Sequence, residues 1–72
     1  MKRLLSITAL EREMARLRTG IIADRELMNA YSDEGDATMA RLYSGRIRRQ
    51  EEELKTCAFT LRHEQRNAKG GR

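Results

Sequence analysis

The sequence has few of the residues on which disulfide, metal and membrane-spanning structures depend. It contains one cysteine, Cys57, and one histidine, His63, among 72 residues, and it has no proline or tryptophan. A single cysteine excludes a disulfide within the chain, which favours a reduced, cytoplasmic setting. One histidine and one cysteine are too few for a zinc site within one chain. No apolar run approaches the roughly 20 residues of a membrane helix, so we expect no contact with a membrane.

The sequence also lacks the residue patterns that enzymes need. No serine has a base nearby, the three residues 51–53 are glutamates that point in different directions around a helix, and no glycine-rich phosphate loop is present. We expect residues 1–72 to form a single small domain with no room for a pocket that buries a substrate. The composition therefore predicts a protein that is not an enzyme and has no metal, cofactor or small-molecule substrate.

Two heptad stripes are the main positive feature of the sequence. In each half, residues recur at alternating spacings of three and four, which is the a/d pattern of a coiled coil. The first stripe is Ile7, Leu10, Met14, Leu17, Ile21, Asp24, Met28 and Tyr31, and the second is Ala40, Tyr43, Ile47, Gln50, Leu54, Cys57 and Leu61. Disordered chains share the high content of charged residues, 36%, but the two stripes indicate a folded helical structure.

The stripes predict an all-α fold, an antiparallel two-helix coiled-coil hairpin. Folding the chain back about residue 34 pairs the stripes in layers whose residue numbers add to 67 or 68. Leu17 then lies opposite Gln50, and Asp24 lies opposite Tyr43, where a hydrogen bond between the carboxylate and the phenol is expected. Because two helices alone bury little core, we expect two hairpins to pair as a homodimeric four-helix bundle.

The predicted elements are a helix over residues 6–32, a turn over 33–36, a helix over 37–66 and a flexible tail over 67–72. Gly35 allows a positive φ in the turn, and Asp36 is a good N-cap for the second helix. Thr8 followed by Glu11 is a capping-box pattern near the start of the first helix. Gly20 weakens that helix, so a break there, which would give three helices, remains an alternative.

Apolar residues outside the stripes predict a surface that binds another protein. A hairpin cannot bury these residues alone, and exposed apolar patches mark sites of association. The expected contact residues are Leu27, Met39, Leu42 and Phe59. The leading functional prediction is a small cytoplasmic regulator or adaptor that binds a protein partner, a second copy of itself, or both.

A basic ridge supports a different function. The net charge is +4, and four cations of the second half recur every seven residues. Spaced cations on a straight helix can follow a phosphate backbone. The candidate nucleic-acid contacts are Arg41, Arg46, Arg48, Arg49, Lys55 and Arg62. No set of exposed aromatic residues for base stacking is apparent beside the ridge. The other interpretations are a solubilising face that carries ion pairs and a structural segment of a larger assembly.

Residues 10–42 resemble the Hha/YdgT family of small nucleoid-associated regulators. The matching residues are Leu10, Glu11, Leu17, Asp24, Glu26, Leu27, Asn29, Tyr31, Asp36, Ala40 and Leu42, with one residue inserted before Asp36. The chain departs from that family at Ala37, where the family has a histidine, and at Arg41, where it has an acidic residue. The two-helix plan is also similar to small hairpin co-chaperones of type III secretion and to Rop-type RNA-binding dimers. These departures leave no functional residue to carry over.

Overall fold

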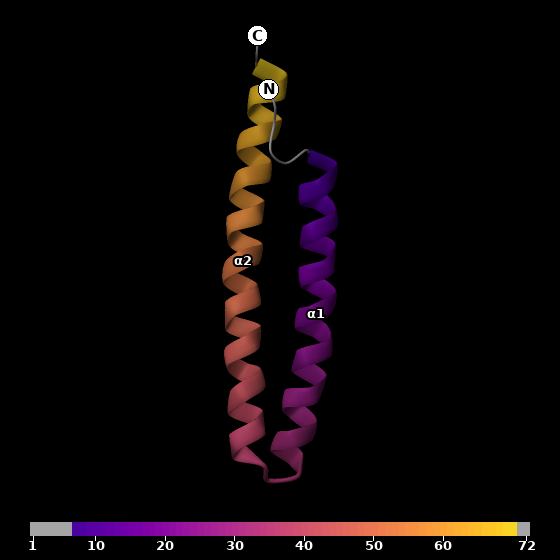
Figure 1. The fold of residues 1–72 in the computed structure, drawn as a ribbon, viewed down its shortest axis with the longest axis vertical. Coiled ribbons are helices and arrows are strands. Elements are labelled where there is room, and N and C mark those ends of the chain that lie inside the picture. The colour runs from indigo at the N-terminus through magenta and orange to yellow at the C-terminus, as the bar shows by residue number, and fades with distance from the viewer. Residues whose placement is uncertain (1–6, 71–72) are drawn as a thin grey trace.

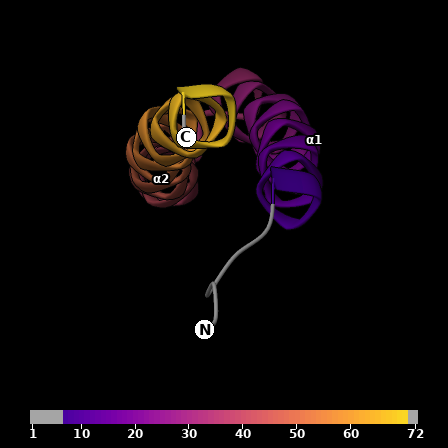
Figure 2. The ribbon, with the colours of Figure 1, turned by 90° about the horizontal axis from the view of Figure 1, so that it is seen from above.

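The protein is an antiparallel hairpin of two long helices (Figure 1). The computed structural model describes residues 7–70, in which α1 spans Ile7–Asp33 and α2 spans Ala37–Gly70. The bend lies at one end of the rod, and the start of α1 lies beside the far half of α2 (Figure 1). Seen from above, the rod is one helix pair thick, with α1 inclined relative to α2 (Figure 2). The predicted all-α helical hairpin is confirmed.

The bend forms from the residues that the sequence indicates. Gly35 has a φ of 80°, which lies in the left-handed region that glycine adopts without strain. Its N–H donates to the carbonyl of Ser32 at 3.0 Å, and the N–H of Asp36 donates to the carbonyl of Tyr31 at 2.9 Å, which together form a Schellman motif. The carboxylate of Asp36 accepts a hydrogen bond from the backbone N–H of Met39 at 3.1 Å and caps α2. A helix-ending glycine next to a helix-starting aspartate thus reverses the chain.

The first helix is continuous through Gly20, so the three-helix alternative is wrong. A Cβ at this position would lie 3.3 Å from Oε1 of Gln50. The absence of a side chain at Gly20 therefore leaves room for the side-chain amide of Gln50 against α1. This contact explains why a weak helix former is tolerated at that position. The cost of glycine in a helix interior, about 1 kcal/mol relative to alanine, is too small to break a helix that packs along its length.

The helix boundaries differ from the predicted ones mainly at the end of α2. This helix continues to Gly70, past the expected end near residue 66, because Ala68 and Lys69 are good helix formers and no breaker precedes Gly70. Much of the predicted tail is therefore helical. Ser6, the expected first residue of the first helix, and residues 71–72 lie outside the described residues.

The core is a single seam made from the two predicted stripes. Its buried apolar residues are Leu10, Met14, Leu17, Ile21 and Ile47. Every other stripe residue is buried or half-buried. The period of 3.5 residues therefore identified correctly which side of each helix faces the other.

The register between the two stripes differs from the predicted one. Oδ2 of Asp24 accepts hydrogen bonds from Nε2 of Gln50 at 3.0 Å and from Nε of Arg46 at 3.2 Å. Gln50 also lies against Gly20, so it sits level with residues 20–24 of α1. The predicted layer that pairs Leu17 with Gln50 is wrong by about one helical turn.

The aromatic contact near the bend is displaced in the same direction. The rings of Tyr31 and Tyr43 are stacked, with centroids 5.8 Å apart and planes at 13°. Tyr43 therefore reaches toward Tyr31. The predicted hydrogen bond between Tyr43 and Asp24 is replaced by the bonds that Arg46 and Gln50 donate to Asp24. The bend accounts for about two residues of the displacement, because it is centred on Gly35 rather than on residue 34 and a shift of the folding point moves each layer by twice that amount.

Two glycines, Gly35 in the bend and Gly45 within α2, allow a matched test of the bend. We expect Gly35→Ala to lower the free energy of unfolding by about 1 kcal/mol, because a side chain disfavours the left-handed conformation. We expect Gly45→Ala to raise it by about 1 kcal/mol, since this helical glycine has open space around its Cβ position. Urea unfolding followed by circular dichroism measures both. A stability gain for Gly35→Ala would contradict the described bend.

Candidate interaction surfaces

The apolar residues near the bend that lie outside the seam share one flank of the hairpin, and we call them the turn patch. Helical periodicity places its members on the same flank of the hairpin, and both helices contribute. The turn patch consists of Ala23, Leu27, Ala30, Met39 and Leu42. Leu27 and Leu42 are 41% and 54% exposed. The structure therefore brings together three of the four predicted protein contacts, which are Leu27, Met39 and Leu42.

The fourth predicted contact, Phe59, belongs to a different surface. Phe59 is 69% exposed and lies about 25 Å along α2 from Leu42, at 1.5 Å per residue. It lines a small hollow with Arg62, His63 and Arg66. Its spacing of three and seven residues from Arg62 and Arg66 places it within the basic ridge. The sequence contains that spacing, whereas the apolar character of Phe59 alone assigns it to a protein-binding surface.

The basic residues of α2 do not all share one face. Arg41, Arg48, Lys55 and Arg62 are exposed and follow one side of the helix. Arg49 is also exposed, but it is turned by about 100° from its neighbour Arg48 and lies on the flank of the turn patch. Four of the six predicted nucleic-acid contacts are therefore aligned.

Arg46, the remaining predicted nucleic-acid contact, is bound to Asp24 at the seam. Its guanidinium pairs with the carboxylate of Asp24 and stands 5.4 Å above the ring centroid of Tyr43, within cation–π distance. The Arg46 side chain is 52% exposed, whereas the side chain of Asp24 is 8% exposed. The pair therefore buries the anion and leaves the cation in water. The positive charge of Arg46 is offset by Asp24 and contributes little to the basic ridge.

Gln50 completes this polar cluster in the seam. Its Nε2 donates to Asp24, which turns its Oε1 toward Gly20, where that oxygen is buried without a hydrogen-bond partner. An unsatisfied buried acceptor costs about 1–3 kcal/mol. The hydrogen bond to Asp24 fixes the orientation of the Gln50 side-chain amide, and this orientation leaves Oε1 unsatisfied. Asp24 is thus the acceptor on which both α2 donors depend.

Two further ion pairs lie on the flanks. Arg25 donates to Oε2 of Glu51 at 3.1 Å and links the two helices. Within α1, Arg16 donates to Glu13. That hydrogen bond lowers the pKa of Glu13 and raises the pKa of Arg16. Both pairs are exposed, so we assign them little stabilising energy.

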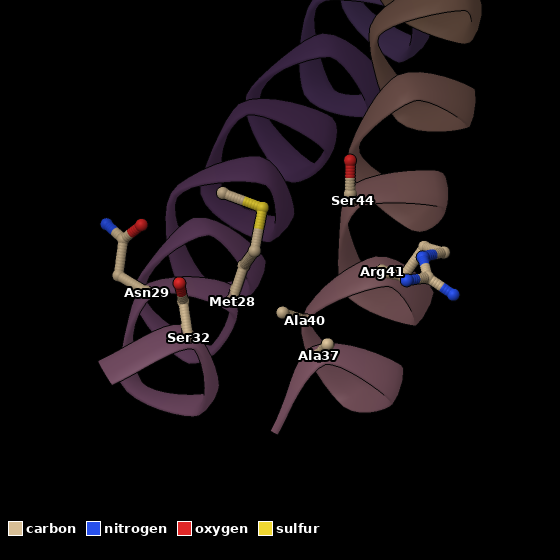
Figure 3. Close-up of a pocket in the computed structure, with 7 residues that line it drawn as sticks. All are labelled: Met28, Asn29, Ser32, Ala37, Ala40, Arg41 and Ser44. Atoms are coloured by element: carbon tan, nitrogen blue, oxygen red, sulfur yellow. The ribbon is translucent and has the colours of Figure 1, made fainter. Parts of the chain in front are cut away.

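The structure also has a wide hollow beside the bend (Figure 3), with a volume of about 370 Å³. Met28 and Ala40 point into the space between the helices, whereas Asn29 and Arg41 point outward. Ser32, Ala37 and Ser44 complete the lining. Because four of the seven lining residues, including Asn29 and Arg41, are exposed and the hollow opens to solvent, it cannot enclose a small ligand as binding sites do.

The described residues offer no obvious metal or membrane site. Across residues 7–70, no group of three or more histidine, cysteine, aspartate or glutamate residues could hold a metal ion. His63 is exposed, and Cys57 is half-buried in the seam as a free thiol. Neither described helix is both long and apolar enough to cross a lipid bilayer.

Comparison with known proteins adds no relative to this description. No protein-family model matches the sequence, and neither a curated protein nor a solved structure matches it at a significant level. The functional argument therefore depends on the surfaces of this chain alone.

The polar cluster can be tested by removing its acceptor. We expect Asp24→Leu to lower the free energy of unfolding by about 1–3 kcal/mol, because the buried amide of Gln50 loses its partner. The double variant Asp24→Leu/Gln50→Leu should recover most of that loss, since no unpaired buried group remains. Urea unfolding of the four members of the cycle measures the coupling. Wild-type stability in Asp24→Leu would show that Gln50 does not depend on Asp24.

Proposed function

We propose that the protein is a small, non-enzymatic interaction module of the cytoplasm, a regulator or adaptor that binds a protein partner through its helical surfaces. The partner that the geometry favours first is a second copy of the same chain, in a homodimeric four-helix bundle. The turn patch is the observation that carries this proposal. Exposed leucines from two helices, at the same level of the rod and flanked by small alanines, allow close approach of another helix pair.

The small core of the hairpin supports the need for a partner. The core contains five buried apolar residues among those described. Small domains with so little core are usually stabilised by association. Burial of the turn patch against a second hairpin would add apolar contacts to this core.

The distribution of residues along this flank favours one arrangement of two hairpins. Beyond the turn patch, the same flank carries Glu13, Arg16, Arg49 and Glu53 toward the open end. A dimer with its bends at opposite ends and full overlap would place leucines against these charges. A two-fold axis along the rod places one turn patch against the other. We therefore favour a dimer whose two bends lie at the same end, which leaves the outer faces free for another protein.

An aspartate in the turn patch tests self-association. We expect Leu42→Asp to convert a dimer into a monomer in sedimentation equilibrium, because a charge would be buried without a partner, while helicity stays unchanged. Gln65→Asp is the matched control, since it adds the same charge to an exposed position on α2 that is turned by about 140° from Leu42 around the helix, and it should remain dimeric. Phe59→Asp tests the separate apolar site. A monomeric wild-type protein, or a dimeric Leu42→Asp, would contradict the proposal.

The same dimer can be tested for the direction of its subunits. A spin label on Thr38→Cys, in a Cys57→Ser background, lies next to the bend. We expect a short label-to-label distance when the bends meet at one end. In a fully overlapping dimer, bends at opposite ends would separate the labels by at least the length of α1, roughly 40 Å at 1.5 Å per residue.

A further inference from the structure

The outward side of α2 carries a row of residues that neither the seam nor the turn patch uses. We call it the outer stripe, and it consists of Arg41, Arg48, Lys55, Phe59, Arg62 and Arg66. All six are exposed. At about 100° per residue, they fall within a sector of roughly 60° around the helix. From its first to its last residue the stripe spans roughly 38 Å at the rise of an α-helix.

The five cations of the outer stripe are not held in ion pairs with the side chains that the structure describes. The ion pairs of the described side chains join Arg16 to Glu13, Arg25 to Glu51 and Arg46 to Asp24, and none includes a cation of the stripe. Glu51 borders the stripe but is bound by Arg25, whereas exposed Glu52 lies between Arg48 and Lys55 and lowers the local charge by one. The stripe is therefore a linear array with an excess of positive charge, which suits a linear polyanion.

Phe59 is the feature that distinguishes this array from a solubilising face. Phe59 is 69% exposed, which is costly for the one phenylalanine of the chain. Phe59 lines a hollow of about 110 Å³ together with Arg62, His63 and Arg66. An exposed ring among cations provides a flat surface for a nucleobase next to groups that bind phosphate.

We propose that the outer stripe binds single-stranded nucleic acid, with the cations contacting successive phosphates and a base stacking on Phe59. A duplex would use the cations but would leave Phe59 without a partner, because its bases are already stacked. An anionic membrane would need a broad apolar face, whereas the stripe has a single apolar residue. The stripe and the turn patch lie on different sides of the hairpin, so this proposal stands independently of self-association.

The charge component is tested with a labelled oligothymidylate of about 15 nucleotides, a length that covers typical single-strand sites. We expect the logarithm of the affinity to fall with the logarithm of the salt concentration, with a slope of about −3.5 for five cations. Arg48→Glu should weaken binding roughly tenfold at low salt and make the slope shallower. Arg12→Glu, the same charge change on the outer side of α1, should have a much smaller effect. Equal losses in both variants would overturn the proposed site.

The stacking component is tested at Phe59. Phe59→Ala should weaken binding of the oligonucleotide roughly tenfold, whereas its effect on heparin, which has charge but no bases, should be small. Phe59→Trp should retain binding, and the fluorescence of this single tryptophan should be quenched by the oligonucleotide. Thr19→Trp, on the outer side of α1, is the control that should stay unquenched. Wild-type protein that does not bind at low salt, unchanged affinity of Phe59→Ala, or equal losses for heparin would overturn the proposal.

Discussion

The buried carboxylate of Asp24 determines how the two helices of this protein meet. Its Oδ2 accepts hydrogen bonds from Arg46 and Gln50, so an aspartate in an apolar seam is compensated only in one alignment of α2. In that alignment Leu54 lies level with Leu17, and apolar residues continue to face each other toward the open end. Polar groups in a seam lower stability but can select one register over others. Asp24 acts here as such a selecting residue.

Much of the fold follows from the sequence, because it depends on periodicity and on local turn chemistry. The spacing of three and four residues identified every buried apolar side chain of the seam, and Gly35 with Asp36 identified the bend. The register could not be obtained in the same way, since heptads permit several alignments that differ by about one helical turn. The choice between them depended on the centre of the bend and on Asp24, whose partner was expected to be Tyr43. A residue's preferred partner in space is not encoded in its heptad position.

The surfaces were predictable in part for the same reason. Helical spacing correctly grouped Leu27 with Leu42 and aligned Arg41, Arg48, Lys55 and Arg62. It did not reveal that Arg46 is held by Asp24, which depends on the register, and residue type obscured the place of Phe59 in the basic row. The resulting hairpin has an apolar flank near its bend and a basic outer side on α2. These two surfaces can serve a dimer and a polyanion at the same time, because neither covers the other.

The most direct test of the register uses the native Cys57 as a reporter. The alignment fixed by Asp24 places Met14 level with Cys57, whereas folding about residue 34 would place Leu10 there. Met14→Cys and Leu10→Cys are equilibrated separately in a glutathione buffer, and the fraction with an intramolecular disulfide is measured. We expect the disulfide to form to a larger fraction in Met14→Cys. More complete closure in Leu10→Cys would contradict the alignment and, with it, the role of Asp24.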